Sequence, residues 1–453
     1  MINFLRTYSL VILGIMMSIA IIMYFTLPLG YSKTVCTNCL IFYLIAVFLI
    51  AINNIKQTFI TFDTVFALSY LYTNFIYPVF LYDTNYNFSL FRFGFNDRYI
   101  THCTLLALIG YLAYALFRIG FFVKCTPKRE RFHIKISNKL KHISICSMFF
   151  LCLLYIKNIG TDYTQVDLGS IGGYLQDICN ILILYLLFAS SCNSKSIKDI
   201  FNKLGISFCV MLLITIFVQL LIGSRTFTLR IGLIVIFLYN TFIHRLHIIK
   251  FCALLFVGAF FMFYLGTSRN GSDGTSISKY FFVNIGEELI INNRSLYVLT
   301  EYADTNGFSF GKSFLMNICS IIPYGNTILN NAFNLSEEDT HSGYKNTMIT
   351  FKYDRTISSK EQFIGLGTNL IGDIYLSFGL FGVISLMSLL GYLIAKSDNL
   401  KYQSFVWLMF YGMFFMNAIY YPRSEYFNLM RIFGWTYFLY YYLNKRNKKW
   451  KKI

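Results

Sequence analysis

Long apolar runs separated by short polar connections fill the chain from residue 7 to residue 266 and again from residue 364 to residue 443. A helix needs about 20 apolar residues to cross the hydrocarbon core of a bilayer, within a range of roughly 17 to 25. The pattern therefore predicts about twelve transmembrane helices, nine before residue 266 and three after residue 364. The expected spans are 7–29, 39–54, 58–82, 100–123, 142–157, 171–192, 204–222, 226–243, 248–266, 364–395, 403–421 and 427–443. The tenth of these is long enough to tilt or to break.

The composition supports this class of fold. Hydrophobic residues make up 56% of the 453 positions and charged residues only 13%, whereas a soluble domain carries about 25% charged residues. The first apolar run continues from Arg6 to Gly30, which is too long for the apolar core of a cleavable signal peptide, so it is expected to remain as the first span. We expect an all-α polytopic membrane protein.

The orientation follows from the basic residues in the connections. With twelve spans and a cytoplasmic N-terminus, the inside segments hold 22 of the 39 Lys and Arg residues and only three acids. Short cytoplasmic loops of membrane proteins are enriched in Lys and Arg in this way. The net charge of +18 is thus mainly a topology signature and attracts anionic lipid, and it does not indicate nucleic-acid binding. Both termini are expected in the cytoplasm.

One polar segment is much longer than the other connections. Residues 267–362 contain charges of both signs but also many aromatic and aliphatic residues, which predicts a folded loop on the periplasmic side. The expected organisation is therefore nine spans in residues 1–266, this loop, three spans in residues 363–443, and a basic tail in residues 444–453.

Arginines stand at the outer ends of two expected spans. Arg225 ends a Gly-Ser-Arg turn and Arg230 follows in the next span, while Arg423 lies in a Tyr-Pro-Arg-Ser-Glu turn and Arg431 follows it. Cations close to the membrane interior usually face a cavity and a partner, and the planar guanidinium group suits phosphate oxygens. The alternative is that these side chains reach outward to lipid headgroups. We expect these arginines to bind phosphate. Glu425 lies in the same turn as Arg423.

A glycine-rich stretch opens the tenth span. It reads Gly365-Leu366-Gly367-Thr368-Asn369, followed by Asp373 about two turns into the expected helix and by Tyr375. Close helix packing through small residues, with one satisfied Asp, is the alternative to a binding role. Together with residues 223–230 and 421–431, residues 365–379 are expected to line a lateral cleft below the long loop.

Two further ionisable residues, His341 and Asp63, are candidates for a functional or structural role. His341 lies in the long loop among several acids, where it is either a general base or a solvated loop residue. Asp63 lies within the third expected span and should pair with a neighbouring helix, because an isolated carboxylate is unfavourable in lipid.

Four features in order resemble the Wzy-type oligosaccharide repeat-unit polymerases, which assemble O-antigen and related surface polysaccharides. They are the turn Gly223-Ser224-Arg225-Thr226, the Ile321-Ile322-Pro323 element in the long loop, the segment Gly367–Gly379, and the turn Pro422–Glu425. The resemblance covers most of the second half of the chain, and the first half is similar only as apolar spans.

The resemblance implies a GT-C-like membrane glycosyltransferase of the bacterial inner membrane with a periplasmic site. Such enzymes transfer an undecaprenyl-diphosphate-linked glycan onto the next lipid-linked repeat unit. It further implies that Arg225 and Arg423 hold the pyrophosphate with support from Arg230 or Arg431, and that Asp373, Glu425 or His341 orients or deprotonates the acceptor. No metal or other cofactor is expected, since fixed cations can stabilise the leaving group. Wzz-type chain-length regulators and Wzx-type flippases are the expected protein partners.

Two other activities use the same kind of lipid-linked glycan. An O-antigen ligase would share the long outer loop and the arginines, but the sequence shows no clear match to the loop histidine motif of ligases. A lipid-linked oligosaccharide flippase would have similar spans, but it would not need a folded loop of this length. The polymerase remains the expected function.

Overall fold

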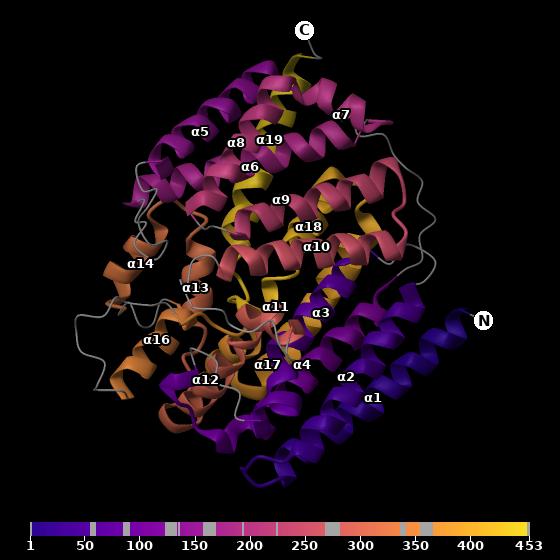
Figure 1. The fold of residues 1–453 in the computed structure, drawn as a ribbon, viewed down its shortest axis with the longest axis vertical. Helices are drawn as coiled ribbons and strands as arrows, with labels where there is room; N and C mark the ends of the chain where they lie inside the picture. Colours follow the sequence, from indigo (N-terminus) through magenta and orange to yellow (C-terminus); the bar gives the residue numbers. More distant parts are fainter. Residues whose placement is uncertain are drawn as a thin grey trace. The chain divides into compact units, whose positions relative to one another are not determined.

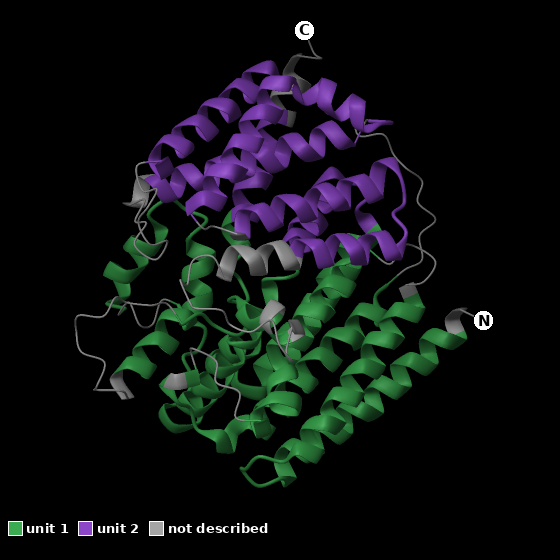
Figure 2. Cartoon of the chain, in the orientation of Figure 1, with its two compact units in different colours: residues 1–125, 277–399, 418–431 green, residues 126–276, 400–417, 432–453 purple. Residues whose placement is uncertain are grey.

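The fold is helical throughout the described part of the chain, which contains no strand (Figure 1). The computed structural model describes residues 2–54, 60–84, 91–122, 134, 136–156, 169–192, 194–222, 225–267, 281–335, 341–353 and 366–450. The chain divides into two compact units, each made of segments distant in sequence (Figure 2). Unit 1 comprises residues 1–125, 277–399 and 418–431, and unit 2 comprises residues 126–276, 400–417 and 432–453.

Unit 1 combines the N-terminal helices with the helices that follow residue 277. Its α-helices are α1 (Ile2–Thr26), α2 (Lys33–Asn54), α3 (Phe62–Asn74), α4 (Ile100–Gly120), α11 (Phe281–Ile290), α12 (Asn293–Asn306), α13 (Lys312–Cys319), α14 (Gly325–Phe333), α16 (Ser342–Tyr353) and α17 (Leu370–Leu400). Its short helical segments are η1 (Tyr77–Leu81), η2 (Tyr82–Thr84), η3 (Phe91–Phe93), η4 (Asp97–Tyr99) and η7 (Tyr421–Arg423). The helices α1 and α2 both lie along α4, whose side chains are mostly buried (Figure 1).

Unit 2 holds the middle helices and the C-terminal ones. They are α5 (Asn138–Ile156), α6 (Gly169–Ser191), α7 (Ile197–Leu204), α8 (Ile206–Ile222), α9 (Arg225–Leu238), η6 (Tyr239–Ile243), α10 (Ile248–Thr267), α18 (Phe405–Asn417) and α19 (Met430–Trp450). Here α5 packs against α6 and α8, and α18 packs against α9 through aromatic contacts of Phe237 with Tyr411 and Phe415.

The prediction of a polytopic membrane protein is confirmed. Seven helices of the described segments are long and apolar enough to cross a bilayer, and the number rises to nine if each of two bent helix pairs forms one span. Two shorter apolar helices, Ile248–Gly258 and Phe405–Asn417, add to this set. The count of twelve spans stays a prediction, as does the GT-C-like arrangement.

One expected span is bent rather than straight, and a second begins at a sharp corner. The span expected at 58–82 consists of α3 followed by Tyr77–Thr84 at 43°, where Pro78 interrupts the regular hydrogen-bond pattern of the helix. The span expected at 204–222 corresponds to α8, and α7 precedes it and meets it at 93°. Gly205 has φ +87° at this corner, a conformation that glycine adopts easily, and a Ser196–Asp199 capping box starts α7.

The predicted break in the tenth span is confirmed within α17. Phe378 and Gly379 leave the helical conformation, and Gly379 has φ +62° and ψ −155°. The loop between α12 and α13 packs against the break, because the backbone N–H of Ser309 donates to the carbonyl of Leu376 at 2.8 Å. A Cβ atom on Gly379 would lie 2.8 Å from the ring of Phe308, so only glycine fits here.

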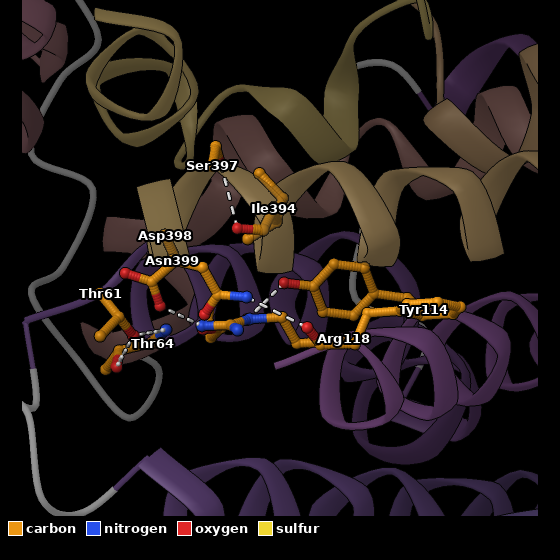
Figure 3. A network of polar contacts seen from close by, with 10 residues as sticks. Thr61, Thr64, Tyr114, Arg118, Ile394, Ser397, Asp398 and Asn399 are labelled. Atoms are coloured by element: carbon orange, nitrogen blue, oxygen red, sulfur yellow. Dashed lines mark hydrogen bonds and ion pairs between the residues drawn. The ribbon is translucent and has the colours of Figure 1, made fainter. Parts of the chain in front are cut away.

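The prediction that Asp63 pairs with a neighbouring helix is also confirmed. Arg118 of α4 donates from Nη2 to Asp63 at 2.8 Å and to Asp398 of α17 at 2.7 Å, and all three side chains are at most 5% exposed. The hydroxyl of Tyr114 donates to Asp63 as well. Figure 3 shows Arg118 between Asp398 and Tyr114. This buried cluster ties α3, α4 and α17 together inside unit 1.

The expected orientation leads to a reporter-fusion result. An alkaline phosphatase moiety fused at Asn306, after α12, should be active because the segment is expected outside, where the enzyme folds. Fusions at Asn138 or after Lys452 should be inactive, because basic cytoplasmic segments surround both positions. Phosphatase activity from the fusion at Asn138 would contradict the twelve-span topology.

Candidate functional site

Asp373 lies at the start of α17 and not two turns inside it, so the expected depth of this carboxylate was wrong. The side-chain Oδ1 of Asn369 accepts from the backbone N–H of Ile371 at 2.9 Å and of Gly372 at 3.4 Å. This side chain caps the helix, which therefore begins at Leu370 rather than at residue 364. Gly367, with φ +70°, lies in the non-helical approach to the cap.

The carboxylate of Asp373 is fully buried and holds two other segments in place. Its Oδ1 accepts from Ser313 Oγ of α13 at 3.1 Å, and its Oδ2 accepts from the backbone N–H of Tyr426 at 2.9 Å. Asp373 thus positions α13 and the turn that contains Glu425, which follows η7, against the first turn of α17.

Glu425 is the centre of a second set of contacts. Its Oε2 accepts from Asn317 Nδ2 of α13 at 2.6 Å and pairs with His341 Nδ1 at 3.0 Å, while Oε1 accepts from Ser342 Oγ at 3.4 Å. The carboxylate side chain is 11% exposed, whereas the His341 side chain is 45% exposed. One imidazole nitrogen of His341 therefore contacts a buried carboxylate, while the rest of the ring is partly exposed. A carboxylate on Nδ1 orients the ring and leaves Nε2 for proton transfer.

The contact between His341 and Glu425 shifts the pKa of both side chains. The hydrogen bond to Glu425 raises the pKa of the His341 imidazole above its ordinary value, and the negative charges of Glu425 and Asp373 act in the same direction. Burial by itself raises the pKa of Glu425, but the hydrogen bonds and charge from His341, together with Asn317, outweigh burial and hold that pKa below its ordinary value. Glu425 is thus an ionised partner for a histidine that titrates above its usual range.

A pocket of about 190 Å³ opens beside His341. Its walls come from α12, the following loop, and the first turns of α13 and α16. The lining residues are Tyr302, Asn306, Gly307, Phe308, Ser309, Lys312, Ser313, His341, Ser342, Lys345 and Leu376. Two lysines, two aromatic rings and several hydroxyl or amide groups around a histidine form a chemically suitable site for a phosphorylated sugar.

Sequence reasoning missed both lysines. The backbone N–H of Lys345 donates to the carbonyl of His341 at 2.9 Å, so Lys345 stands one helical turn after the histidine, and its ammonium lies 4.8 Å from the ring centre of Tyr302. The four-residue spacing from His341 could have indicated Lys345. Lys312 is the one charged residue between Thr305 and Ser336, and that isolation could have indicated it.

The other expected binding residues of the glycine-rich stretch have structural contacts. The carbonyl of Gly367 accepts from Asn346 Nδ2, and Asn369 is fully buried and donates to Asn74. Tyr375 donates from its hydroxyl to Asp304 at 2.8 Å. None of the three is among the pocket-lining residues. Gly365 lies outside the described residues.

The two expected arginines of unit 1, Arg423 and Arg431, are not among the pocket-lining residues. Arg423 in η7 is 29% exposed and contacts Glu288 of α11, with 3.5 Å between Nη1 and Oε2, and it lies against the ring of Tyr420. Arg431 is half-buried at the start of α19. Arg225 opens α9 in unit 2, where the half-buried Arg230 follows it. Of the expected cleft, residues 365–379 and 421–431 meet through Asp373, while Gly223 and Ser224 fall outside the structure's described ranges.

The described ranges contain no group of three or more His, Cys, Asp or Glu side chains placed to hold a metal ion. The positive charge beside the pocket comes from Lys312 and Lys345.

The fold and this site define a polytopic membrane protein with a histidine–carboxylate pair beside a lysine-lined pocket. The chain belongs to the family described as O-antigen polysaccharide polymerase Wzy, whose model matches residues 7–452, nearly the whole length. Family membership supports O-antigen polymerase activity of the glycosyltransferase type in general. Neither the curated proteins nor the solved structures contain a significant match to this chain.

Proposed function

We propose that the protein extends a surface polysaccharide by moving an undecaprenyl-diphosphate-linked glycan onto the next lipid-linked repeat unit. The observation that carries the proposal is the His341–Glu425 pair beside a pocket with two lysines, in a chain of the O-antigen polymerase family. The pair can activate a hydroxyl group, and the lysines can neutralise a diphosphate.

The proposed reaction is a displacement at the anomeric carbon of the growing chain. The acceptor hydroxyl forms the new C–O bond while the bond between the anomeric carbon and the phosphate oxygen breaks. The electron pair leaves with undecaprenyl diphosphate, and Nε2 of His341 takes the hydroxyl proton. Glu425 keeps the imidazole oriented and stabilises the imidazolium that forms. Asp373 acts indirectly as a positioning residue, through Ser313 and the backbone of Tyr426.

The leaving diphosphate needs charge stabilisation more than protonation. Lys312 and Lys345 line the pocket and are the nearest candidates, and we propose that they act in place of a bound metal ion. Arg423 becomes available if its partly exposed contact with Glu288 opens, since such surface pairs are worth only about 0–1 kcal/mol. Arg225 with support from Arg230, and Arg423 with support from Arg431, are proposed to bind the diphosphate as well.

The basic connections and the resemblance described above support a site on the periplasmic face of the inner membrane. Flipped lipid-linked repeat units would then reach the enzyme from a Wzx-type flippase, and a Wzz-type regulator would set the number of repeats. These partners are inferred from the reaction, which needs a supply of repeats and a limit on chain length.

Removing a pocket lysine should reduce polymerisation. In Lys312→Ala and Lys345→Ala, loss of one charge-assisted contact of about 1.5–3 kcal/mol should slow extension roughly ten- to a hundredfold. Arg225→Ala and Arg423→Ala should act in the same direction. The measurement is the length distribution of surface polysaccharide on gels, with membrane protein levels checked in parallel. Lys33→Ala is the matched control, because Lys33 is an exposed lysine of unit 1 paired with Asp83.

The products distinguish polymerase from ligase. A polymerase defect leaves single repeat units transferred to the final acceptor, whereas a ligase defect leaves long chains on the lipid carrier. Normal ladders from both lysine variants would show that the pocket does not hold the diphosphate. Long carrier-bound chains would favour the ligase instead.

A further inference from the structure

The helices α13 and α14 belong to a segment almost without charge. Between Thr305 and Ser336 the chain contains a single charged residue, Lys312, although Asp304 precedes this stretch and Glu337 follows it directly. A water-exposed loop of this length normally carries many charges. The composition of the segment is that of an element in contact with something apolar.

In α13 two polar side chains face the protein and two large apolar ones face outward. Ser313 and Asn317 are buried and donate to Asp373 and Glu425. Leu315 and Ile318 lie on the opposite side and are 45% and 42% exposed. A helix at a water surface has the reverse arrangement.

The helix α14 also buries polar atoms and exposes large apolar side chains. The side-chain oxygens of Asn326 and Asn330 are buried and have no hydrogen-bond partner in the part of the chain that the structure describes. Ile328 is 63% exposed and Phe333 is 65% exposed. Both helices therefore expose large apolar side chains while they bury polar atoms.

The helix α13 packs beside an exposed part of a membrane span. The ring of Phe314 in α13 contacts the ring of Phe378 at the break in α17, with 5.8 Å between ring centres. One turn further along α17, Phe381 is 79% exposed, and α17 is long and apolar enough to cross the bilayer. An exposed phenylalanine on a membrane span faces lipid, and α13 starts beside it.

We propose that α13 and α14 lie in the bilayer interface as a membrane-inserted hairpin, with Leu315, Ile318, Ile328 and Phe333 in contact with lipid chains. The near absence of charge, the large apolar side chains exposed on both helices and the contact of α13 with α17 all favour lipid as the occupant. The proposal concerns placement in the membrane and does not depend on the proposed reaction.

The placement of α13 in the bilayer interface sets the depth of the pocket in the membrane. Because α13 carries Lys312 and Ser313 on the pocket side and Leu315 and Ile318 on the lipid side, this one helix forms the wall between the pocket and the bilayer. The pocket then lies at headgroup depth, where a lipid diphosphate is located.

Fluorescence quenching by lipid tests the placement. The three native tryptophans are replaced by phenylalanine, and one tryptophan is introduced by Leu315→Trp, Ile328→Trp or Phe333→Trp. Each purified variant is placed in nanodiscs of phosphatidylcholine brominated in the acyl chains. Thr305→Trp is the control, since Thr305 is exposed on α12 next to the charged Asp304.

All three hairpin positions should lose at least half of their emission in brominated lipid, and the control should lose far less. Three positions keep the test valid if one variant is recovered poorly. Equal quenching at the hairpin and control positions would overturn the proposal. So would shielding of the hairpin tryptophans from bromolipid by a second copy of the chain, detected as a cross-linked dimer through this face.

Discussion

Replacing His341 with glutamine should slow chain extension by about a hundred- to ten-thousandfold, the range that a positioned general base contributes. Glutamine can still reach Glu425 but cannot take a proton from an acceptor hydroxyl. The chain should remain folded, because Asp373, Ser313, Asn317 and Glu425 keep the rest of the network. The measurement is the rate of repeat addition, read from the polysaccharide ladder and normalised to protein in the membrane.

The pH dependence separates a catalytic histidine from a structural one. The imidazole accepts a proton only when it is neutral, so the rate should rise with pH as His341 loses its proton. Because the Glu425 hydrogen bond raises the pKa of His341, this rise should be centred above the ordinary histidine value of about 6.5. Glu425→Gln removes the negative charge and should move the rise to lower pH.

Two outcomes would oppose this role of His341. A Glu425→Gln profile identical to that of the unmodified protein would show that the pair does not control the titration. Normal extension by His341→Gln would remove the histidine from the mechanism. His244→Gln is the control, since His244 is an exposed histidine in unit 2 and should show normal extension.

Replacing Arg118 with methionine should destabilise unit 1 by about 3–5 kcal/mol, the effect of removing one partner from a buried ion pair. Asp63 and Asp398 would then remain buried without the cation that contacts both. The melting temperature of the protein in detergent should fall markedly, and less folded protein should accumulate in membranes.

A variant that removes all three charges of the cluster is the control for this effect. The triple variant Asp63→Asn, Arg118→Met, Asp398→Asn removes the two carboxylates with the cation, and it should recover most of the lost stability. A triple variant as unstable as Arg118→Met alone would attribute the loss to packing, for example of Arg118 against the ring of Phe122. An unchanged melting temperature for Arg118→Met would contradict the structural role of the cluster.

The membrane class and the positions of most helices could be predicted because apolar runs in lipid have few alternatives to a helix. The pairing of Asp63 followed from the same physics, since a carboxylate in a span needs a partner. The sequence did not show that this partner is Arg118, because Arg118 and Asp398 lie at the ends of spans distant along the chain.

The bends and helix starts were harder to predict because single side chains decide them. Asn369 starts α17 at Leu370 instead of residue 364, and this moved Asp373 from the helix interior to its first turn. Gly205 turns the chain sharply before α8. Hydropathy does not report the side-chain cap at Asn369 or the positive φ of Gly205, so it could not give the exact start of α17 or the angle of the corner.

The candidate site was predicted in part. Asp373, His341 and Glu425 were each predicted as candidates from separate parts of the sequence. In the structure α13 connects Asp373 with Glu425, and Glu425 contacts His341, but the sequence did not indicate the role of α13. Lys312 and Lys345 were missed because two lysines in a loop are ordinary surface residues until the fold places them in one pocket. Arg423 contacts Glu288 instead, and the role of Arg225 and Arg423 in binding diphosphate stays a prediction.

The most direct test of the central proposal uses the purified protein in nanodiscs with a synthetic undecaprenyl-diphosphate-linked repeat unit as the one substrate. Mass spectrometry of the lipid products over time measures chain extension and release of undecaprenyl diphosphate together. The account predicts lipid-linked products of two and more repeats, one released carrier for each bond formed, and at least a hundredfold less of both with His341→Gln. Products that never exceed one repeat, or equal rates for the two proteins, would contradict it.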